Sequence, residues 1–252
     1  MVALRSAIFN VLFYATLIVL MILGLPSVLM GRHAVFFMAR LWGEASLWLL
    51  DRICGLSIEI RGLENIPKGG YLIAAKHQSF LETFSLLRYA PDFAYVLKRE
   101  LMYIPIFGWY LWGGEQIAID RARGKTALSV LGERAIAVLR AGRQIFIFPE
   151  GTRRTPGAPP QYKFGVAFLY ADGNAPCLPV ALNTGLYWGR RGLERRPGVA
   201  VIEYLPPIAP GLDREVFLAT LEETIEAACR RLNAEALAKD SSLAPRLAAA
   251  QT

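Results

Sequence analysis

A long uncharged run near the amino terminus constrains this chain more than any other feature of its sequence. Residues 6–31 contain no Asp, Glu, Lys or Arg, and Asn10 is the single amide side chain among them. A helix of about twenty apolar residues is long enough to cross the hydrocarbon core of a bilayer. The Gly-Leu-Pro-Ser sequence at 24–27 predicts the end of this helix, because proline removes a backbone donor and clashes with the preceding turn. The run therefore predicts association with a membrane.

A second apolar stretch, at residues 28–54, differs from the first because it carries polar side chains at helical spacing. Four of them are separated by seven, four and seven residues: His33, Arg40, Glu44 and Asp51. On a helix these four fall on one narrow side, opposite a wide apolar surface that is rich in Trp. That pattern is typical of a helix that lies in the membrane interface. The alternative is one ordinary transmembrane helix followed by a helix of the protein core.

The composition limits the chemistry that the rest of the chain can perform. The 252 residues suit one α/β domain with an appendage, and 54% of them are hydrophobic while only 19% are charged. Three cysteines lie far apart without a Cys-x-x-Cys pair, which supports neither a disulfide framework nor a zinc site. Because the chain has two histidines, imidazole chemistry must use His33 or His77. His33 is the weaker candidate, since it lies inside an apolar stretch with no loop beside it.

After residue 55 the sequence alternates between strand-like and helix-like stretches. The strand-like runs are at 56–60, 71–75, 93–97, 116–120, 144–148, 177–182 and 199–204. The helical patterns are at 80–89, 103–112, 125–140, 164–171 and 214–239. This alternation predicts an α/β fold with a mixed, largely parallel sheet flanked by helices. The expected organisation is a membrane-associated two-helix segment at 1–54, an α/β domain at 55–240 and a disordered tail at 241–252.

The first polar group that can carry chemistry follows the strand-like run at 71–75. His77 lies in the loop after this run, Ser79 is placed to cap the next helix, and Glu82 lies one turn into that helix. A carboxylate bonded to one imidazole nitrogen fixes the tautomer and leaves the other nitrogen basic, which is how a hydroxyl group is activated. The sequence therefore predicts His77 as a general base with Glu82 as its partner. The alternative is a capping histidine beside a solvated carboxylate.

The second group is Phe-Pro-Glu-Gly-Thr-Arg-Arg at 148–154, at the end of another strand-like run. Gly151 allows a ligand to approach the backbone closely. Arg153 and Arg154 supply planar guanidinium groups that suit phosphate. Glu150 is able either to accept a hydrogen bond from a substrate hydroxyl or to hold Arg153 in place. The alternative is a charged turn with surface ion pairs.

A third group of charges lies at the ends of two further strand-like runs. Lys98 and Arg99 end one run, and Asp120 and Arg121 end the next, with a helical stretch between them. The two basic strand ends and this helix can line one cleft. Taken singly, each of these charges is typical of a solvated surface residue.

Together the three groups resemble the glycerolipid acyltransferase family, specifically the bacterial 1-acyl-sn-glycerol-3-phosphate acyltransferases. That family carries, in order, His-x4-Asp, then Lys/Arg-Glu-Leu with Pro, Gly and Ile-Asp-Arg, then Phe-Pro-Glu-Gly-Thr-Arg, then Val/Leu-Pro-Val-Ala. The four blocks of this chain are at 77–82, 98–121, 148–153 and 178–181, and Lys163 and Gly165 fit a Lys-x-Gly segment of the family. One difference is that Glu82 stands where the family usually has Asp. The apolar amino terminus also resembles the membrane-embedded helix pair of this family.

The resemblance implies a mechanism. His77, oriented by Glu82, would take the proton of a lysophospholipid hydroxyl, and that oxygen would attack an acyl thioester of coenzyme A or acyl carrier protein. The resemblance implies no Cys or Ser nucleophile, no metal and no bound cofactor. The acceptor would be 1-acyl-glycerol 3-phosphate, acylated at its sn-2 hydroxyl to give phosphatidic acid. The residues expected to hold its glycerol phosphate are Glu150, Gly151, Thr152, Arg153, Lys98 and Arg121.

Other functions stay open at the level of the sequence. The acceptor can instead be glycerol 3-phosphate, a lyso-ornithine lipid or lysophosphatidylcholine. A non-catalytic membrane lipid binder has no use for an oriented base, and a lipid hydrolase would lack a serine elbow. The formal net charge of +7 fits an anionic membrane surface and anionic substrates, and no nucleic-acid motif accompanies it. The expected partners are membrane lipids, a lysophospholipid and an acyl donor, at the inner (cytoplasmic) membrane with the active site facing the cytoplasm.

The densest basic cluster of the chain lies outside the four blocks. It consists of Arg190, Arg191, Arg195 and Arg196. Such a cluster contacts lipid headgroups or an acidic carrier protein, or it is simply part of a solvated loop.

Overall fold

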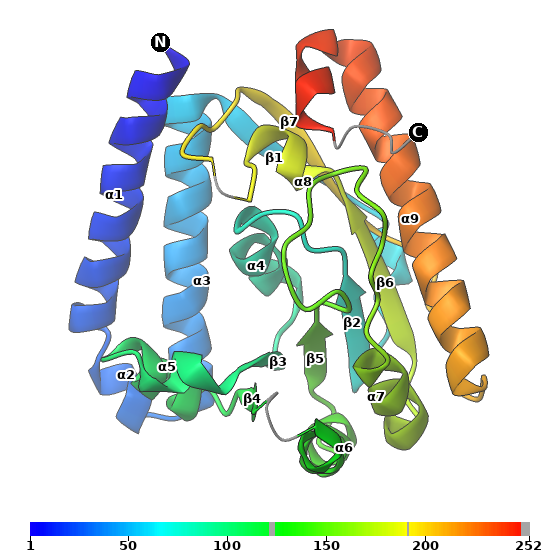
Figure 1. The fold of residues 1–252 in the computed structure, drawn as a ribbon. Coiled ribbons are helices and arrows are strands. Elements are labelled where there is room, and N and C mark those ends of the chain that lie inside the picture. The colour runs from blue at the N-terminus through cyan, green and yellow to red at the C-terminus, as the bar shows by residue number, and fades with distance from the viewer. Residues whose placement is uncertain (121–123, 191, 248–252) are drawn as a thin grey trace.

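The computed structural model describes residues 1–120, 124–190 and 192–247, and the side chains of all of these except 124–130. Helices cover both faces of a seven-stranded sheet, and an amino-terminal helical hairpin lies along one side of the molecule (Figure 1). The hairpin consists of α1 (Val2–Leu23), α2 (Pro26–Leu29) and α3 (Arg32–Leu49), followed by a wider helical turn at Leu50–Cys54. α1 ends before residue 24 and Pro26 begins α2, as the 24–27 sequence predicts.

α1 is exposed along most of its length, but one face of it packs against the domain. Among the described residues it is the one helix that is long and apolar enough to cross a membrane. Phe9 and Phe13 on its inner face are buried in a core that they share with α3 and the sheet. Two of its polar side chains, Ser6 and Asn10, also contact the domain. α1 therefore presents an apolar outer face while its inner face is covered by protein.

Two residues of the polar stripe, Arg40 and Glu44 on α3, contact the domain, whereas His33 and Asp51 are exposed. Arg40 donates to three backbone carbonyls in the segment 87–91, at 2.6–3.1 Å. Glu44 accepts from Arg88, with 2.6 Å between Oε1 and Nε. The segment contains the end of a 3₁₀ helix at Leu86–Tyr89, whose last carbonyls lack intrahelical partners, and Arg40 donates to one of these carbonyls, that of Leu87. Phe37, Leu41 and Trp48 of α3 are exposed, so the interpretation of α3 as an interfacial helix stays a prediction. What the sequence did not show is that Arg40 and Glu44 meet the domain.

The sheet has the strand order β1-β7-β6-β2-β5-β3-β4 and confirms the predicted mixed, largely parallel arrangement. All neighbouring strands are parallel except β6 and β7. The strands are β1 (Leu56–Arg61), β2 (Tyr71–Ala75), β3 (Phe93–Lys98), β4 (Ile117–Ile119), β5 (Gln144–Ile147), β6 (Cys177–Leu182) and β7 (Gly198–Tyr204). Each of the seven predicted runs is a strand, to within one residue at each end.

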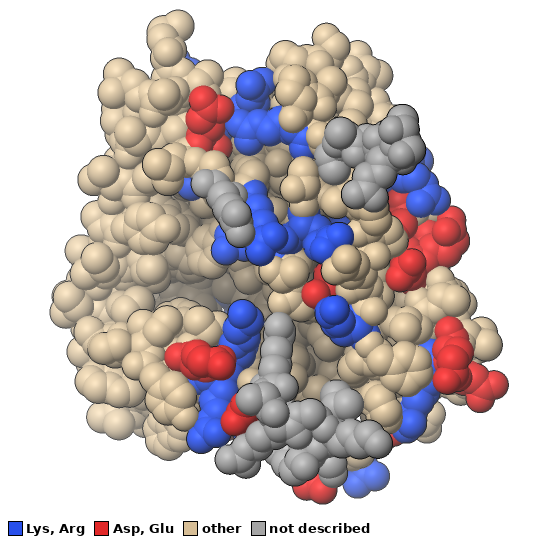
Figure 2. Space-filling model, viewed as in Figure 1, with Lys and Arg blue, Asp and Glu red and all other residues tan. Residues whose placement is uncertain are grey.

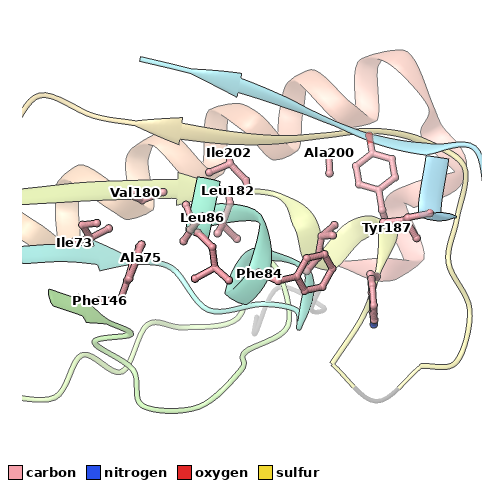
Figure 3. Packing of buried hydrophobic residues seen from close by; sticks show 14 of the residues in the cluster. Ile73, Ala75, Phe84, Leu86, Phe146, Val180, Leu182, Tyr187, Ala200 and Ile202 are labelled. Carbon is pink, nitrogen blue, oxygen red and sulfur yellow. The ribbon is translucent and has the colours of Figure 1, made fainter. Parts of the chain in front are cut away.

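Helices on the two faces of the sheet enclose two apolar cores. The helices of the domain are α4 (Leu81–Ser85), α5 (Phe107–Gly113), α6 (Gly124–Arg140), α7 (Gly165–Gly173), α8 (Thr184–Tyr187) and α9 (Arg214–Lys239). Side chains alternate along the central strand β2, so Ile73 and Ala75 enter one core, whereas Leu72 and Ala74 enter the other. Figure 3 shows the first core, where side chains of β2, β6 and β7 meet those of α4.

Two of the predicted boundaries are wrong. The helix expected at 103–112 begins only at Phe107, because Ile104 precedes Pro105 and keeps an extended backbone. The tail expected to be disordered at 241–252 is ordered over its described part. A 3₁₀ helix spans Ser241–Arg246, and Leu243 is fully buried in the first core, which fixes this segment to the domain.

Candidate active site

His77 and Glu82 come together at the carboxyl end of β2. The strand ends at Ala75 and α4 begins at Leu81, so Glu82 lies in the first turn of that helix. His77 Nδ1 is 3.0 Å from Glu82 Oε1. The Glu82 side chain is fully buried, whereas 16% of the His77 side chain is exposed. The arrangement places an accessible imidazole over a carboxylate that water does not reach.

The surroundings of Glu82 decide which nitrogen of His77 carries the proton. The backbone N–H groups of Gln78 and Ser79 donate to Oε1 at 2.8 and 2.7 Å, and the Thr184 hydroxyl donates to Oε2 at 2.8 Å. A carboxylate that accepts from all of these groups also accepts from His77, so Nδ1 carries the hydrogen and Nε2 is the basic nitrogen. The sequence analysis missed Thr184, which lies 102 residues from Glu82 along the chain.

Phe148 fixes the plane of the imidazole. Its ring stacks on His77 with the centroids 4.0 Å apart and the planes 17° apart. Phe148 directly follows β5, which pairs with β2, so the two motifs lie side by side although they are distant in sequence. The backbone N–H of Arg154 also donates to the His77 carbonyl, at 2.8 Å. The histidine is therefore held by a carboxylate, by an aromatic ring and by the backbone of the neighbouring loop.

The loop at 149–154 presents three of the expected acceptor-binding residues beside the imidazole. Gly151 has a φ of +66°, a left-handed conformation that glycine adopts at little cost. The Thr152 hydroxyl accepts a hydrogen bond from Arg190 at 3.2 Å. Arg153 is half-buried in the same loop. The structure thus brings Gly151, Thr152 and Arg153 next to the loop of His77.

Glu150 belongs to the same loop but points into the protein. Its side chain is buried, and Oε2 lies 3.1 Å from the ammonium of Lys76, which is only 2% exposed. The arginine that approaches Glu150 is Arg154, with 3.8 Å between Nε and Oε1. The expectation that Glu150 holds Arg153 in place is therefore wrong. A buried carboxylate needs hydrogen-bond donors or a nearby cation, and for Glu150 the cation is Lys76, the residue next to His77.

The Lys76–Glu150 pair is part of a larger buried cluster. Lys76 Nζ is 2.6 Å from Glu226 Oε1 on α9, and the Tyr162 hydroxyl donates to the same oxygen at 3.0 Å. Burial raises the pKa of Glu150, and the attraction of Lys76 opposes that rise. Burial alone would lower the pKa of Lys76, but Glu150 and Glu226 outweigh it and the pKa is raised. The cluster ties the loop of His77 and the loop at 149–154 to α9.

The third predicted group lies, like His77, at the carboxyl ends of the parallel strands. Lys98 ends β3 and is exposed, and the parallel pairing of β3 with β4 sets it opposite Ile119. Arg99 forms an ion pair with Asp120 at 3.2 Å. Arg121 lies outside the described residues. Figure 2 shows that Lys and Arg side chains gather around a hollow in this face of the molecule.

Comparison with known proteins assigns the chain to a family. A family model described as Acyltransferase matches residues 57–183, which is half of the chain and includes the loops of His77 and Glu150. A 1-acyl-sn-glycerol-3-phosphate acyltransferase from Pseudomonas aeruginosa is 35% identical over 227 residues, or 89% of this chain and 88% of that protein. The chain belongs to the Acyltransferase family. The predicted resemblance is thereby confirmed, and the chain is an enzyme of the acyltransferase class.

Further acyltransferases extend this relationship. The chloroplastic 1-acyl-sn-glycerol-3-phosphate acyltransferase LPAT1 of Arabidopsis thaliana is 32% identical over 199 residues, which are 75% of this chain and 54% of that protein. The crystal structure of the 1-acyl-sn-glycerophosphate (LPA) acyltransferase PlsC from Thermotoga maritima has a TM-score of 0.76 at 24% identity. The match covers 93% of this chain and 98% of that one, so the shared fold extends well beyond residues 57–183.

Proposed function

We propose that this acyltransferase moves a fatty acyl chain from a thioester to the sn-2 hydroxyl of 1-acyl-glycerol 3-phosphate, giving phosphatidic acid. The acceptor is supported by the relatives from Pseudomonas aeruginosa and Arabidopsis thaliana, whose names specify it. The observation that carries the chemistry is the pairing of accessible His77 with fully buried Glu82. The donor is a thioester of coenzyme A or of acyl carrier protein.

The proposed reaction needs one base and no covalent enzyme intermediate. His77 Nε2 removes the proton of the acceptor hydroxyl, and the oxygen attacks the thioester carbonyl carbon to form a tetrahedral intermediate. The intermediate collapses by breaking the carbon–sulfur bond, and the departing thiolate takes the proton from the imidazolium. Glu82 stabilises the imidazolium by accepting the hydrogen bond from Nδ1–H. A base positioned in this way contributes about 10²–10⁴ in rate.

Acceptor binding is assigned to the basic loop beside the imidazole. Arg153 supplies a planar fork for the phosphate, and Gly151 lets the acceptor approach the backbone. Lys98, at the end of β3, is proposed as a further phosphate contact, and so is Arg121, which lies outside the described residues. Glu150 contributes indirectly, since its pairing with Lys76 fixes the loop that carries these groups.

The amino-terminal hairpin is proposed to hold the enzyme at the inner (cytoplasmic) membrane, with the active site facing the cytoplasm. α1 has the length and hydropathy of a membrane helix and an exposed apolar face. Its inner face is covered by protein through Phe9 and Phe13, so lipid meets it from one side only. The arrangement leaves the apolar outer face of α1 free to contact the membrane from which a lysophospholipid is taken.

The direct test is acyl transfer from a radiolabelled acyl thioester to 1-acyl-glycerol 3-phosphate. Membranes with the wild type, with His77→Ala and with His33→Ala are compared at matched expression. We expect labelled phosphatidic acid from the wild type and from His33→Ala, and a loss of about 10²-fold or more in His77→Ala. Equal product from His77→Ala would contradict the mechanism. Product only with glycerol 3-phosphate, lyso-ornithine lipid or lysophosphatidylcholine would replace the proposed acceptor.

A further inference from the structure

Two sequence features that the proposed mechanism does not use meet in the structure. The first is Asn10, the amide in the uncharged amino-terminal run, and the second is the arginine-rich segment at 188–196. Asn10 Oδ1 accepts from an Arg195 guanidinium nitrogen at 2.7 Å, and its Nδ2 donates to the Leu193 carbonyl at 3.2 Å. One turn earlier on α1, the Ser6 hydroxyl accepts from the Arg195 backbone N–H at 2.8 Å. The membrane-type helix therefore directs Ser6 and Asn10 to this one segment.

Arg195 is an unusual residue to find at this contact because it is buried without a carboxylate partner in the described part of the chain. It is 5% exposed, and its guanidinium donates to the carbonyls of Gly192 and Glu194 and lies 3.8 Å from the Trp188 ring centroid. Burial lowers its pKa to about 10, so it stays charged at neutral pH. A buried charge is stable only when its partners are fixed, and Asn10 is one of them. The shape of the 188–196 segment thus depends on α1.

The other end of the same segment reaches the acceptor loop. Arg190 is exposed, and its guanidinium donates to the hydroxyl of Thr152 at 3.2 Å. Thr152 lies between Gly151 and Arg153, the groups assigned to the acceptor phosphate. A neutral hydroxyl is a weak partner for a guanidinium compared with a phosphate, which accepts two parallel hydrogen bonds from it. Arg190 is therefore placed to exchange Thr152 for an anionic group that enters this loop.

We propose that Arg190 is an additional acceptor-binding residue, which contacts the phosphate of the lysophospholipid, and that the contact of Asn10 with Arg195 positions it. The inference rests on the proposed function for the identity of the acceptor. It assigns a role to α1 besides membrane attachment, because Ser6 and Asn10 on the inner face of the helix hold the segment that carries Arg190. Asn10 and Arg195 are positioning residues and touch no substrate.

The first test compares two arginines of one segment. Arg190→Ala is expected to raise the KM for 1-acyl-glycerol 3-phosphate about tenfold, with kcat and the KM for the acyl donor within about twofold of the wild type. Arg196→Ala removes the same charge, but Arg196 contacts Ser242 near the carboxyl terminus, and no change in acceptor KM is expected. Arg190→Lys should recover part of the loss. An unchanged acceptor KM in Arg190→Ala, or equal changes in both alanine variants, would overturn the role of Arg190.

The second test addresses the coupling to α1. Asn10→Leu keeps the helix apolar but removes both hydrogen bonds to the 188–196 segment, whereas Val11→Leu changes the neighbouring, exposed position. Asn10→Leu is expected to speed amide hydrogen exchange across residues 186–196 about tenfold and to raise acceptor KM about threefold, and Val11→Leu to do neither. Unchanged exchange in Asn10→Leu would overturn the coupling. A wild type that is inactive with every phosphate-bearing acceptor would refute the proposed function and the role of Arg190 together, while the exchange measurement would still decide the coupling.

Discussion

The two buried glutamates of the site, Glu82 and Glu150, hold it together in different ways. Glu82 accepts from an imidazole and from neutral donors, so its charge faces the group that we propose to gain and lose a proton. Glu150 pairs with Lys76, a cation that is itself shielded from solvent. The first carboxylate therefore supports the chemistry, and the second supports the shape of the loops. Substitution of Glu82 should therefore lower the reaction rate. Loss of the Glu150 ion pair should instead lower the stability of the fold.

Glu82→Gln should have the largest effect on rate. The variant keeps the length of the side chain but replaces the carboxylate that fixes the His77 tautomer by an amide. We expect kcat to fall by about 10²–10⁴ while the protein still folds. Steady-state rates and thermal unfolding of the same preparation check this, with the exposed Glu64→Gln as a charge-matched control. A kcat within threefold of the wild type would show that Glu82 does not orient the base.

Lys76→Met should have the largest effect on stability. It leaves Glu150 and Glu226 buried without their shared cation. We expect the free energy of unfolding to fall by about 3–5 kcal/mol, because a buried ion pair that loses one member leaves an uncompensated charge. Denaturant titration in detergent measures this. The double variant Lys76→Met/Glu150→Gln should recover part of the loss, and an equally unstable double variant would contradict the pairing.

Thr184→Val should lower the reaction rate through Glu82, but by less than Glu82→Gln does. It removes the hydroxyl that donates to Glu82 Oε2 and leaves a buried acceptor without a partner. We expect kcat to fall about tenfold with little change in acceptor KM, and Thr184→Ser to restore most of the activity. If acceptor KM changes and kcat does not, Thr184 acts on binding and its assignment to Glu82 is wrong.

The smallest expected effect is a difference in alkaline stability. The pKa of Lys76 is raised above its ordinary value of 10.5 in the folded protein, so the folded state binds this proton more tightly than the unfolded state. The stabilisation is complete below the unfolded pKa and is lost as the pH rises through the folded pKa. We expect unfolding free energies measured from about pH 9 to about pH 12 to fall more steeply in the wild type than in Lys76→Met. If the unfolding free energies of the two proteins fall in parallel with pH, the pairing of Lys76 with the two glutamates is contradicted.

Local sequence patterns predicted the parts of the molecule whose partners are close in the chain. The seven strands follow from apolar runs, and the His77–Glu82 contact follows from one loop and the first turn of α4. Both depend on backbone geometry within a few residues. The family blocks then identified the loop at 149–154 as the neighbour of that contact.

The interactions that the sequence analysis missed join distant segments. Thr184 reaches Glu82 from the end of β6, and Lys76 meets Glu226 across 150 residues of chain. A charged residue at the end of a buried strand signals that a partner must exist, but only the fold determines which one. The partner of the polar stripe of α3 was not predictable for the same reason. Its periodicity defines a face, but it does not show that Arg40 lies against the segment 87–91.

The central claim is that His77, oriented by Glu82, activates the acceptor for direct transfer. The most direct test is rapid-mixing measurement of thiol release from acyl-CoA or acyl carrier protein, with and without 1-acyl-glycerol 3-phosphate, in the wild type and His77→Ala. The account predicts that the wild type releases thiol only with acceptor present, at a rate about 10²-fold or more above His77→Ala. A burst of thiol equal to the enzyme concentration before acceptor is added would reveal an acyl-enzyme and would contradict the account.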